Sequence, residues 1–395
     1  MLTLEEAWER LLALAPRMPV VETPTSDPAA RYLAADLSAL RTQPPADLSA
    51  MDGYAVSGAP PWTRIGESRA GEPFGGSLEP GQCTRISTGA WMPEGADRVV
   101  IQENAEVTGE AVTLATGEHL PQPSAHLRKR GFDFSQGDAL LKRGTLLGPA
   151  QRALAMAAGH DRVPHYEAPS VSILDSGDEL AALPSQCGPN QIPASNGPMI
   201  AAMIAPWAAR IRRLGPIPDD RKALANALAK VDDPILITTG GASVGDHDLI
   251  KNALRDWGAT LDFWKVAIKP GKPLMIATRP REGGHQVILG LPGNPVSSFV
   301  TGFLFALPLI KAAMGDPGPL PRAVSRIAAH DLPATSKRRE FLRAVSDGET
   351  VRLASSQDSS ALVALASANC LIDRPAGSDP IRAGERVAVY NLQNG

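Results

Sequence analysis

Hydrophobic positions between about residue 171 and residue 314 follow two alternating spacings. Continuous apolar runs of strand length lie at 171–174, 210–214, 235–239, 263–268 and 286–290. Between and after these runs, apolar residues repeat at helical spacing in a segment that begins at Ser195 and in segments 221–230, 247–257 and 295–314. Strands and helices that alternate through short loops form right-handed crossovers. The pattern therefore predicts a mostly parallel sheet between helices, a three-layer α/β/α arrangement.

Two helices are predicted near the N-terminus. Thr3 and Glu6 fit a capping box, and the apolar spacing that follows predicts an amphipathic helix over 3–15. Residues 28–40 are predicted to form a second helix. Its apolar side would consist of Tyr32, Leu33, Leu37 and Leu40. Pro149 opens a further, alanine-rich helix that reaches Ala158.

Two other regions show the pattern of β-structure. From Pro44 to about Gly144, short apolar runs alternate with glycine, proline and aspartate turns. After the proline- and glycine-rich segment 315–321, strand-like runs return at 340–345 and 382–389. A β-rich region and a small separate C-terminal β-domain are therefore expected on either side of the α/β region.

Composition narrows the class of protein. The chain has 395 residues, more than one ordinary core accommodates, with 43% hydrophobic and 21% charged residues. A net charge of only −3 argues against a nucleic-acid partner. The N-terminus does not have the pattern of a signal peptide, and the apolar run Val296–Ile310 is shorter than a membrane span. Three widely spaced cysteines suggest a reducing, cytoplasmic location, without a disulfide framework or a zinc site.

The richest chemistry follows the strand at 235–239. Gly240, Gly241 and Gly245 allow backbone conformations in which successive N–H groups surround an anion in front of a helix. Acidic residues also follow three of the predicted strands: Glu179, Asp219 or Asp220, and Asp248. The carboxyl ends of parallel strands meet at one sheet edge, so these acids predict a Mg²⁺ site. For each acid taken alone, a helix-capping role explains its position equally well.

Lysines form the second group of candidates. Lys265 and Lys269 are predicted to lie on one face of the strand 263–268 and the residues that follow it, and Lys272 stands between two prolines. Rigidly placed lysines suit phosphate or another tetrahedral oxyanion of molybdate size as point charges. The alternative interpretation is a solvent-exposed face with salt bridges.

The N-terminal β-rich region supplies three more candidates. Asp52 and Thr88 lie in turn-like segments that either reverse the chain or face a ligand. Asp133 follows the basic run 128–130, which is either solvated or in contact with phosphate.

One short motif suggests a different enzyme. Gly241-Ala-Ser-Val-Gly245 matches the nucleophile turn of α/β-hydrolases, with Ser243 as the nucleophile. His330 is the only suitably late histidine, and it lies beyond the linker in the C-terminal β-domain. The additional Gly240 and the lysines have no use in ester hydrolysis, so this alternative is weak.

Several segments together resemble a known family. In order, they are Ser49-Ala-Met-Asp-Gly-Tyr-Ala, Thr88-Gly-Ala, Pro93-Glu-Gly-Ala-Asp97, Ser176-Gly-Asp-Glu-Leu180, Gly240-Gly-Ala-Ser-Val-Gly245, Lys269-Pro-Gly-Lys-Pro273 and Gly290-Leu-Pro-Gly-Asn-Pro-Val-Ser297. This order is similar to that of the molybdopterin molybdenumtransferases, the MoeA type that also forms the E-domain of gephyrin. One departure is Ala194, where the family usually has an acid.

The resemblance implies an activity. These enzymes insert molybdate into adenylylated molybdopterin and release AMP with the help of Mg²⁺. The residues carried over as catalytic are Asp52, Glu179, Asp248, Lys265 and Lys269, and those for metal are Glu179, Asp220 and Asp248. Substrate would contact Thr88, Asp133, Gly240, Gly241, Ser243, Gly245, Lys272, Pro292 and Asn294. Molybdopterin adenylyltransferase activity or a non-enzymatic scaffold are the alternative functions.

The resemblance also implies an architecture. It comprises an elongated linker domain (1–43 and 140–168), an inserted β-rich domain (44–139), an α/β molybdopterin-binding domain (169–316) and a C-terminal β-barrel-like domain (317–395). The family forms homodimers in which two subunits share each site, so Asp52, Thr88 and Asp133 would act on the partner's substrate. A molybdopterin adenylyltransferase and molybdoenzyme maturation factors are possible further partners.

Overall fold

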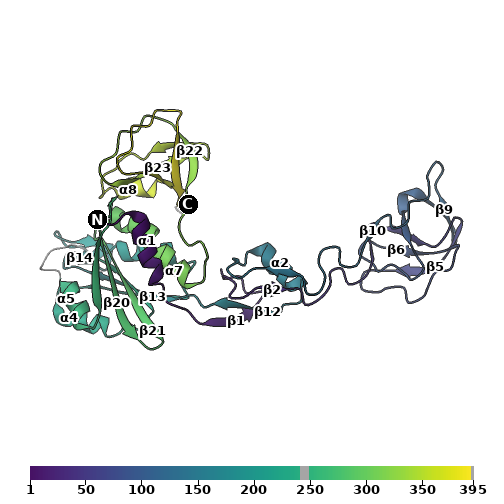
Figure 1. Cartoon of the computed structure of the whole chain (residues 1–395), viewed down its shortest axis with the longest axis horizontal. Coiled ribbons are helices and arrows are strands. Elements are labelled where there is room, and N and C mark those ends of the chain that lie inside the picture. Colours follow the sequence, from purple (N-terminus) through teal and green to yellow (C-terminus); the bar gives the residue numbers. More distant parts are fainter. Residues whose placement is uncertain (241–248, 393–395) are drawn as a thin grey trace.

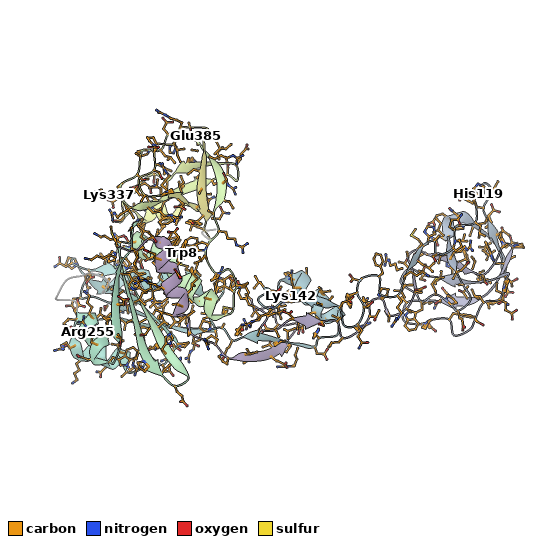
Figure 2. All side chains as sticks on the ribbon, viewed as in Figure 1. Trp8, His119, Lys142, Arg255, Lys337 and Glu385 are labelled. Atoms are coloured by element: carbon orange, nitrogen blue, oxygen red, sulfur yellow. The ribbon has the colours of Figure 1, made fainter. Side chains whose placement is uncertain are left out.

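The chain is elongated, with most of its mass at the two ends (Figure 1). The computed structural model describes residues 1–240 and 249–392. An α/β region and the C-terminal barrel lie together at one end, and a β-rich domain lies at the other (Figure 1). A slender arm joins them, and on it Lys142 forms an ion pair with Asp36 at 3.2 Å (Figure 2).

The central sheet confirms the predicted α/β class. Its strand order is β16-β13-β17-β21-β20-β18. The first four strands are parallel: β16 (Arg210–Ile217), β13 (Ser170–Ser176), β17 (Ile235–Thr239) and β21 (Gly284–Leu291). The fifth strand, β20 (Pro273–Arg281), is not in the predicted set and pairs antiparallel with β21. The edge strand β18 (Thr260–Lys265) pairs antiparallel with β20 and so runs in the direction of the first four.

Helices cover both faces of this sheet. One face carries α1 (Leu4–Ala13), α3 (Asn196–Ile204), α6 (Pro295–Thr301) and α7 (Leu307–Ala313), which share a core with Ile173 and Ile237. The other carries α4 (Arg221–Leu228) and α5 (Leu249–Asp256), packed on Leu174 and Leu236. Consecutive residues of one strand point to opposite faces, which explains why the strands are apolar throughout.

Two predicted details of the helices can be compared with the structure. The capping box is present, because the Thr3 hydroxyl accepts from Glu6 N at 3.1 Å and the Glu6 carboxylate accepts from Thr3 N at 2.7 Å. The helical segment Pro295–Ala313, which contains α6, a π-helical turn and α7, has 19 residues. It is long and apolar enough to cross a membrane, but 78% of its most apolar window is buried inside the protein.

The arm is built from paired extended segments. β1 (Val20–Pro24) pairs with β12 (Arg162–Tyr166), β2 (Leu37–Ser38) pairs with β11 (Ala139–Leu141), and α2 (Pro149–Ala157) packs beside them. The helix predicted over residues 28–40 is therefore wrong. Leu33 and Leu37 are buried, but through contacts with residues more than a hundred positions away, including Leu147 and Val163.

The distal β-domain contains one six-stranded sheet and one small ribbon. The sheet order is β7-β4-β6-β5-β9-β8. Its strands are Arg98–Ile101, Gly53–Val56, Gln82–Ile86, Trp62–Ser68, Ala111–Leu114 and Ala105–Thr108, in that order. The ribbon pairs β3 (Leu48–Ser49) with β10 (Leu127–Arg128).

The C-terminal sheet closes into a small barrel. Its order is β19-β23-β24-β22-β26-β25, and an additional pairing of β23 with β25 closes it. The strands are Ile268–Lys269, Arg339–Ser346, Thr350–Leu353, Val324–Ala328, Arg386–Asn391 and Cys370–Arg374, in that order. Because β19 precedes β20 in the chain, a segment of the α/β region contributes an edge strand to the barrel and joins the two bodies.

Candidate functional site

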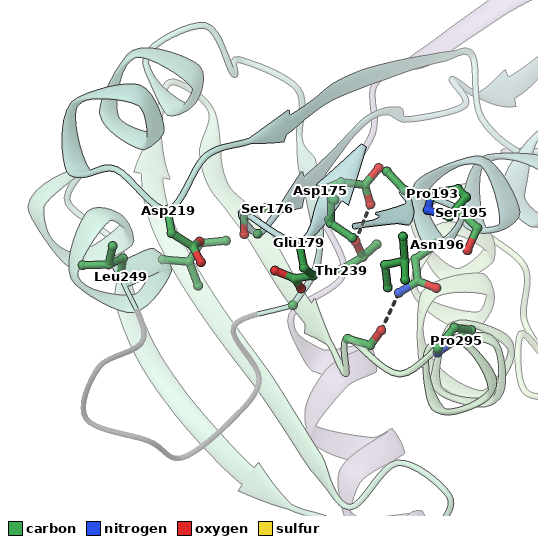
Figure 3. A pocket seen from close by; sticks show the side chains of 17 residues that line it. Asp175, Ser176, Glu179, Pro193, Ser195, Asn196, Asp219, Thr239, Leu249 and Pro295 are labelled. Atoms are coloured by element: carbon green, nitrogen blue, oxygen red, sulfur yellow. Dashed lines mark hydrogen bonds between the residues drawn. The ribbon is translucent and has the colours of Figure 1, made fainter. Parts of the chain in front are cut away.

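A cavity of about 550 Å³ opens at the carboxyl ends of the parallel strands. It lies where the topology switches, since the chain crosses from β13 to β16 on one side and then to β17 on the other. Asp175, Glu179 and Asp219 line it, together with Thr239 and Gly240 (Figure 3). The strand ends therefore bring two of the predicted regions, the acidic loop and the start of the glycine loop, into one site.

Carboxylates gather on one side of this cavity. Asp178 accepts a hydrogen bond from Asp219 N at 3.1 Å, which holds the loop after β13 against the loop after β16. Burial, together with the nearby charges of Asp178 and Glu179, raises the pKa of Asp219. A bound hard cation would relieve mutual repulsion of this kind. Among the described residues, however, no three His, Cys, Asp or Glu side chains are grouped closely enough to hold a metal ion.

The side chains of Asp219 and Asp220 have different positions in the structure. Asp219 faces the cavity, as Figure 3 shows. Asp220 instead caps α4, because its exposed side chain accepts from Ala223 N at 2.7 Å. Asp219, and not Asp220, therefore lines the cavity, and a metal role for either residue stays a prediction.

Asp175, near the end of β13, is not among the predicted site residues, although it directly precedes the segment Ser176-Gly-Asp-Glu-Leu180. It is 2% exposed, accepts a hydrogen bond from the Thr239 hydroxyl, and burial raises its pKa. A Cβ on Gly197 would come within 2.1 Å of its Oδ2, so only glycine fits there. The neighbouring Asn196 donates to the Gly293 carbonyl at 2.7 Å. This network joins the ends of β13 and β17, the start of α3 and the loop after β21.

The glycine loop is described only at its first residue. Gly240 lines the cavity with φ +147°, and its N–H donates to the Leu291 carbonyl at 3.0 Å. The predicted residues Gly241, Ser243, Gly245 and Asp248 lie outside the described residues. Ala194 also lines this cavity.

His330 does not offer a base for a serine nucleophile. One of its ring nitrogens, Nε2, accepts from Leu353 N at 3.0 Å, and the other, Nδ1, contacts the Asp331 carbonyl at 3.1 Å. Both contacts lie within the C-terminal domain, so the histidine has a structural role there.

A second cavity, of about 380 Å³, lies between the α/β region and the barrel. Lys269, Ser297 and Arg343 line it, with the segment 357–359. Arg343 is 1% exposed and donates from Nη2 to the carbonyls of Ser356 and Asp358 at 3.1 and 3.0 Å. Its Nε has no hydrogen-bond partner among the described residues. A buried guanidinium beside a lysine is suited to an oxyanion.

One loop separates the two cavities. Gly293 and Pro295 line the acidic cavity, while Ser297 lines the cationic one. Between them Asn294 caps α6 by accepting from Ser297 N at 3.2 Å and donates to Ser359 Oγ at 3.3 Å. Pro292 is buried at the start of the loop. The predicted residues Pro292 and Asn294 thus belong to the loop that lies between the two cavities.

The lysines do not share one strand, and this prediction is wrong. β18 ends at Lys265, and the chain then leaves the central sheet so that Lys269 enters the barrel as part of β19. Backbone hydrogen bonds fix the crossing, from Val266 N to Lys272 O at 3.0 Å and from Ala267 N to Leu2 O at 2.8 Å. Of the three lysines only Lys269 lines the cationic cavity; Lys265 and Lys272 are exposed beside the crossing.

The remaining candidates lie away from both cavities. Asp52 accepts from Thr88 N at 2.7 Å, and this hydrogen bond lowers the pKa of Asp52. Both residues flank strands of the distal domain, at the far end of the arm (Figure 1). Asp133 is exposed and follows the basic run, in which Lys129 forms an ion pair with Asp47 at 2.8 Å. Within one chain, these residues do not meet Glu179.

Comparison with known proteins covers nearly the whole chain. Residues 2–159 match the MoeA N-terminal region (domains I and II), residues 172–312 a probable molybdopterin binding domain, and residues 326–392 the MoeA C-terminal region (domain IV). A molybdopterin molybdenumtransferase of Haemophilus influenzae is 33% identical, with 98% of both chains covered. Another, of a Nostoc species, is 33% identical over 92% of this chain and 86% of its own.

A solved structure agrees with the sequence comparison. The molybdopterin biosynthesis MoeA protein of Pyrococcus horikosii superposes with a TM-score of 0.81 at 27% identity, covering 99% of each chain. The relatives in Haemophilus and Nostoc thus match this chain over nearly its full length, and so does the solved structure. This chain belongs to the molybdopterin molybdenumtransferase family.

Proposed function

We propose that this protein inserts molybdate into adenylylated molybdopterin and releases AMP in a Mg²⁺-dependent reaction. One observation carries the proposal: a carboxylate-lined cavity and a cation-lined cavity lie on either side of one short segment, with Gly293 and Pro295 lining the first and Ser297 lining the second. The phosphoanhydride end of the substrate needs carboxylates that hold Mg²⁺ beside it, and the end that receives molybdate needs cations that hold this oxyanion. The adjacent cavities offer that pair of environments.

The acidic cavity suits the adenylate end. Glu179 and Asp219 would hold Mg²⁺, together with Asp248 as the family resemblance implies, and the bound ion would supply a Lewis acid for the phosphoanhydride. Asp175 and Asn196 hold the surrounding loops in place through Thr239 and Gly293. Gly240 and the N-terminus of α3 present backbone groups to the same space.

The cationic cavity suits molybdate. Lys269 offers an ammonium, and Arg343 a guanidinium that two backbone carbonyls already hold in place. Cations oriented before the ligand arrives need little reorganisation, so they stabilise an oxyanion efficiently. Lys265 and Lys272 would contribute only their electrostatic field, because neither lines the cavity.

The distal residues are proposed to act on the other subunit of a homodimer. Asp52 and Thr88 form a hydrogen-bonded pair on the domain that lies at the end of the arm. An arm of this shape carries that pair away from its own cavities, and a two-fold symmetric dimer would bring it to the partner's. Asp133, in the same part of the chain, would join them. We propose a cytoplasmic location, in keeping with three free cysteines.

A single-turnover assay tests this function. Purified protein is given adenylylated molybdopterin, Mg²⁺ and molybdate, and AMP and molybdenum cofactor are measured. Release of AMP that requires molybdate supports insertion. In a parallel reaction with ATP and molybdopterin, formation of adenylylated molybdopterin would instead indicate an adenylyltransferase. Neither activity from a folded dimer would indicate a scaffold.

A further inference from the structure

Three charged residues lie in a row across adjacent strands of the C-terminal barrel. The β19–β23 register places Lys269 opposite Glu340, and the β23–β25 register places Glu340 opposite Arg374. Paired residues of neighbouring strands point to the same face of a sheet. The row therefore reads positive, negative, positive, and its first member lines the cationic cavity.

The carboxylate of Glu340 is held close to Lys269. The distance from Lys269 Nζ to Glu340 Oε1 is 3.6 Å, and the Ser336 hydroxyl donates to the same oxygen at 3.2 Å. The Glu340 side chain is 14% exposed, whereas that of Lys269 is 53% exposed. The anion is thus sheltered, whereas the lysine that it neutralises is about half-exposed and lines the cavity.

Arg374 lies on the other side of Glu340, and two of its side-chain nitrogens have no acceptor among the described residues. It is 1% exposed, and its Nη2 donates to the Asp379 carbonyl. Its Nε and Nη1 have no hydrogen-bond partner among the described residues. Burial lowers the pKa of Arg374, and the charge of Glu340 opposes this change. Unpaired buried guanidinium nitrogens are costly, so a carboxylate that approaches them is favoured.

We propose that Glu340 is an internal counter-ion of Lys269. When an oxyanion binds to the Lys269 ammonium, the Glu340 carboxylate leaves it and turns toward Arg374. This inference rests on the proposed function and adds a positioning residue to it. The Glu340 carboxylate stays paired with the Lys269 ammonium until molybdate binds, and afterwards Arg374 neutralises the carboxylate. Competition of this kind weakens oxyanion binding and so keeps molybdate available for transfer.

The charge-removing variant Glu340→Gln gives a prediction with a definite sign. Glutamine keeps the volume and the acceptor for Ser336 but no longer competes for Lys269. Calorimetric titration of the full-length protein with sodium molybdate is expected to show binding about two- to fivefold tighter than in the wild type, the range of a partly exposed ion pair. The KM for molybdate should fall by a similar factor. General structural damage would weaken binding, not tighten it.

Glu5→Gln is the matched control, because Glu5 of α1 forms an ion pair with Arg339, the β23 residue next to Glu340. Its molybdate affinity should equal that of the wild type. Unchanged or weaker binding by Glu340→Gln would overturn the inference while leaving the proposed function intact. Wild-type protein that does not bind molybdate would refute the cationic cavity itself, and the inference with it.

Arg374→Met tests the other half of the row. Without the second cation, Glu340 stays on Lys269, and molybdate binding is expected to weaken about twofold or more. Thermal unfolding verifies that the variant is folded. Affinity equal to the wild type in a folded protein would show that Arg374 does not receive the carboxylate.

Discussion

The Asn294 side chain donates to Ser359 Oγ at 3.3 Å and so ties the loop between the two cavities to the barrel. Through its Oδ1 the same side chain caps α6. One residue therefore sets both the start of a core helix and the position of the segment 357–359, which lines the cationic cavity. This contact connects the geometry of the acidic site to that of the cationic one.

Two substitutions separate these roles of Asn294. Asn294→Ala removes the cap and the link, and is expected to lower the free energy of unfolding by about 1 kcal/mol. Asn294→Ser keeps a capping oxygen but does not reach Ser359, so its stability in urea should stay near that of the wild type. Both variants should bind molybdate more weakly. Wild-type affinity in Asn294→Ser would show that the link to the barrel is unimportant.

The assignment of the acid after β16 is tested by a neighbouring pair. Asp219→Asn should abolish most Mg²⁺-dependent AMP release with little change in stability, because it removes a cavity carboxylate. Asp220→Ala should cost about 1 kcal/mol of stability by removing a helix cap, and Asp220→Ser should restore it. Both Asp220 variants should retain activity. The reverse outcome would return the metal site to Asp220.

Gly197 is expected to tolerate no side chain. A Cβ would lie 2.1 Å from Asp175 Oδ2, so Gly197→Ala must displace the buried carboxylate at a cost of about 1–3 kcal/mol, as for other overpacked sites. The control is Gly293→Ala, in the same cavity, because a Cβ there meets nothing within 4 Å. Urea unfolding curves measure both. Equal stability of the two variants would contradict the tight contact.

The arm should become less stable in mild acid. His165 on β12 is 2% exposed, and burial lowers its pKa below the ordinary value of about 6.5. As the pH falls below that value, the unfolded chain binds a proton that the folded protein resists, so folding stability is lost. The wild-type melting temperature should therefore fall more steeply from about pH 7 to pH 5 than that of His165→Gln. Parallel curves would contradict this.

The spacing of apolar residues predicts a strand or helix correctly where the buried side chains repeat with the period of that element. The strands around 171–174 and 235–239 are apolar on both sides because helices cover both faces, and that composition is visible in sequence. Residues 28–40 show the limit. The spacing of Leu33 and Leu37 fits a helix, but pairing with distant segments of the arm decides their conformation.

The candidate site shows the same division. Acids that follow a strand could be located by their position, since topology brings the strand ends together. The choice between Asp219 and Asp220 depends on which side chain begins α4, a difference of one residue that spacing does not resolve. The spacing predicts the lysines on one strand, because no feature of the local sequence marks the point where the chain passes from one sheet to another.

The central claim is that this protein forms molybdenum cofactor at sites shared between two subunits. Complementation between Asp52→Ala and Glu179→Ala tests it most directly. Each variant alone should be folded and inactive in molybdate-dependent AMP release. After subunit exchange, mixed dimers contain one intact site, so an equal mixture should regain roughly a quarter of wild-type activity. A mixture that stays inactive although mixed dimers have formed, or an Asp52→Ala protein with full activity, would contradict the account.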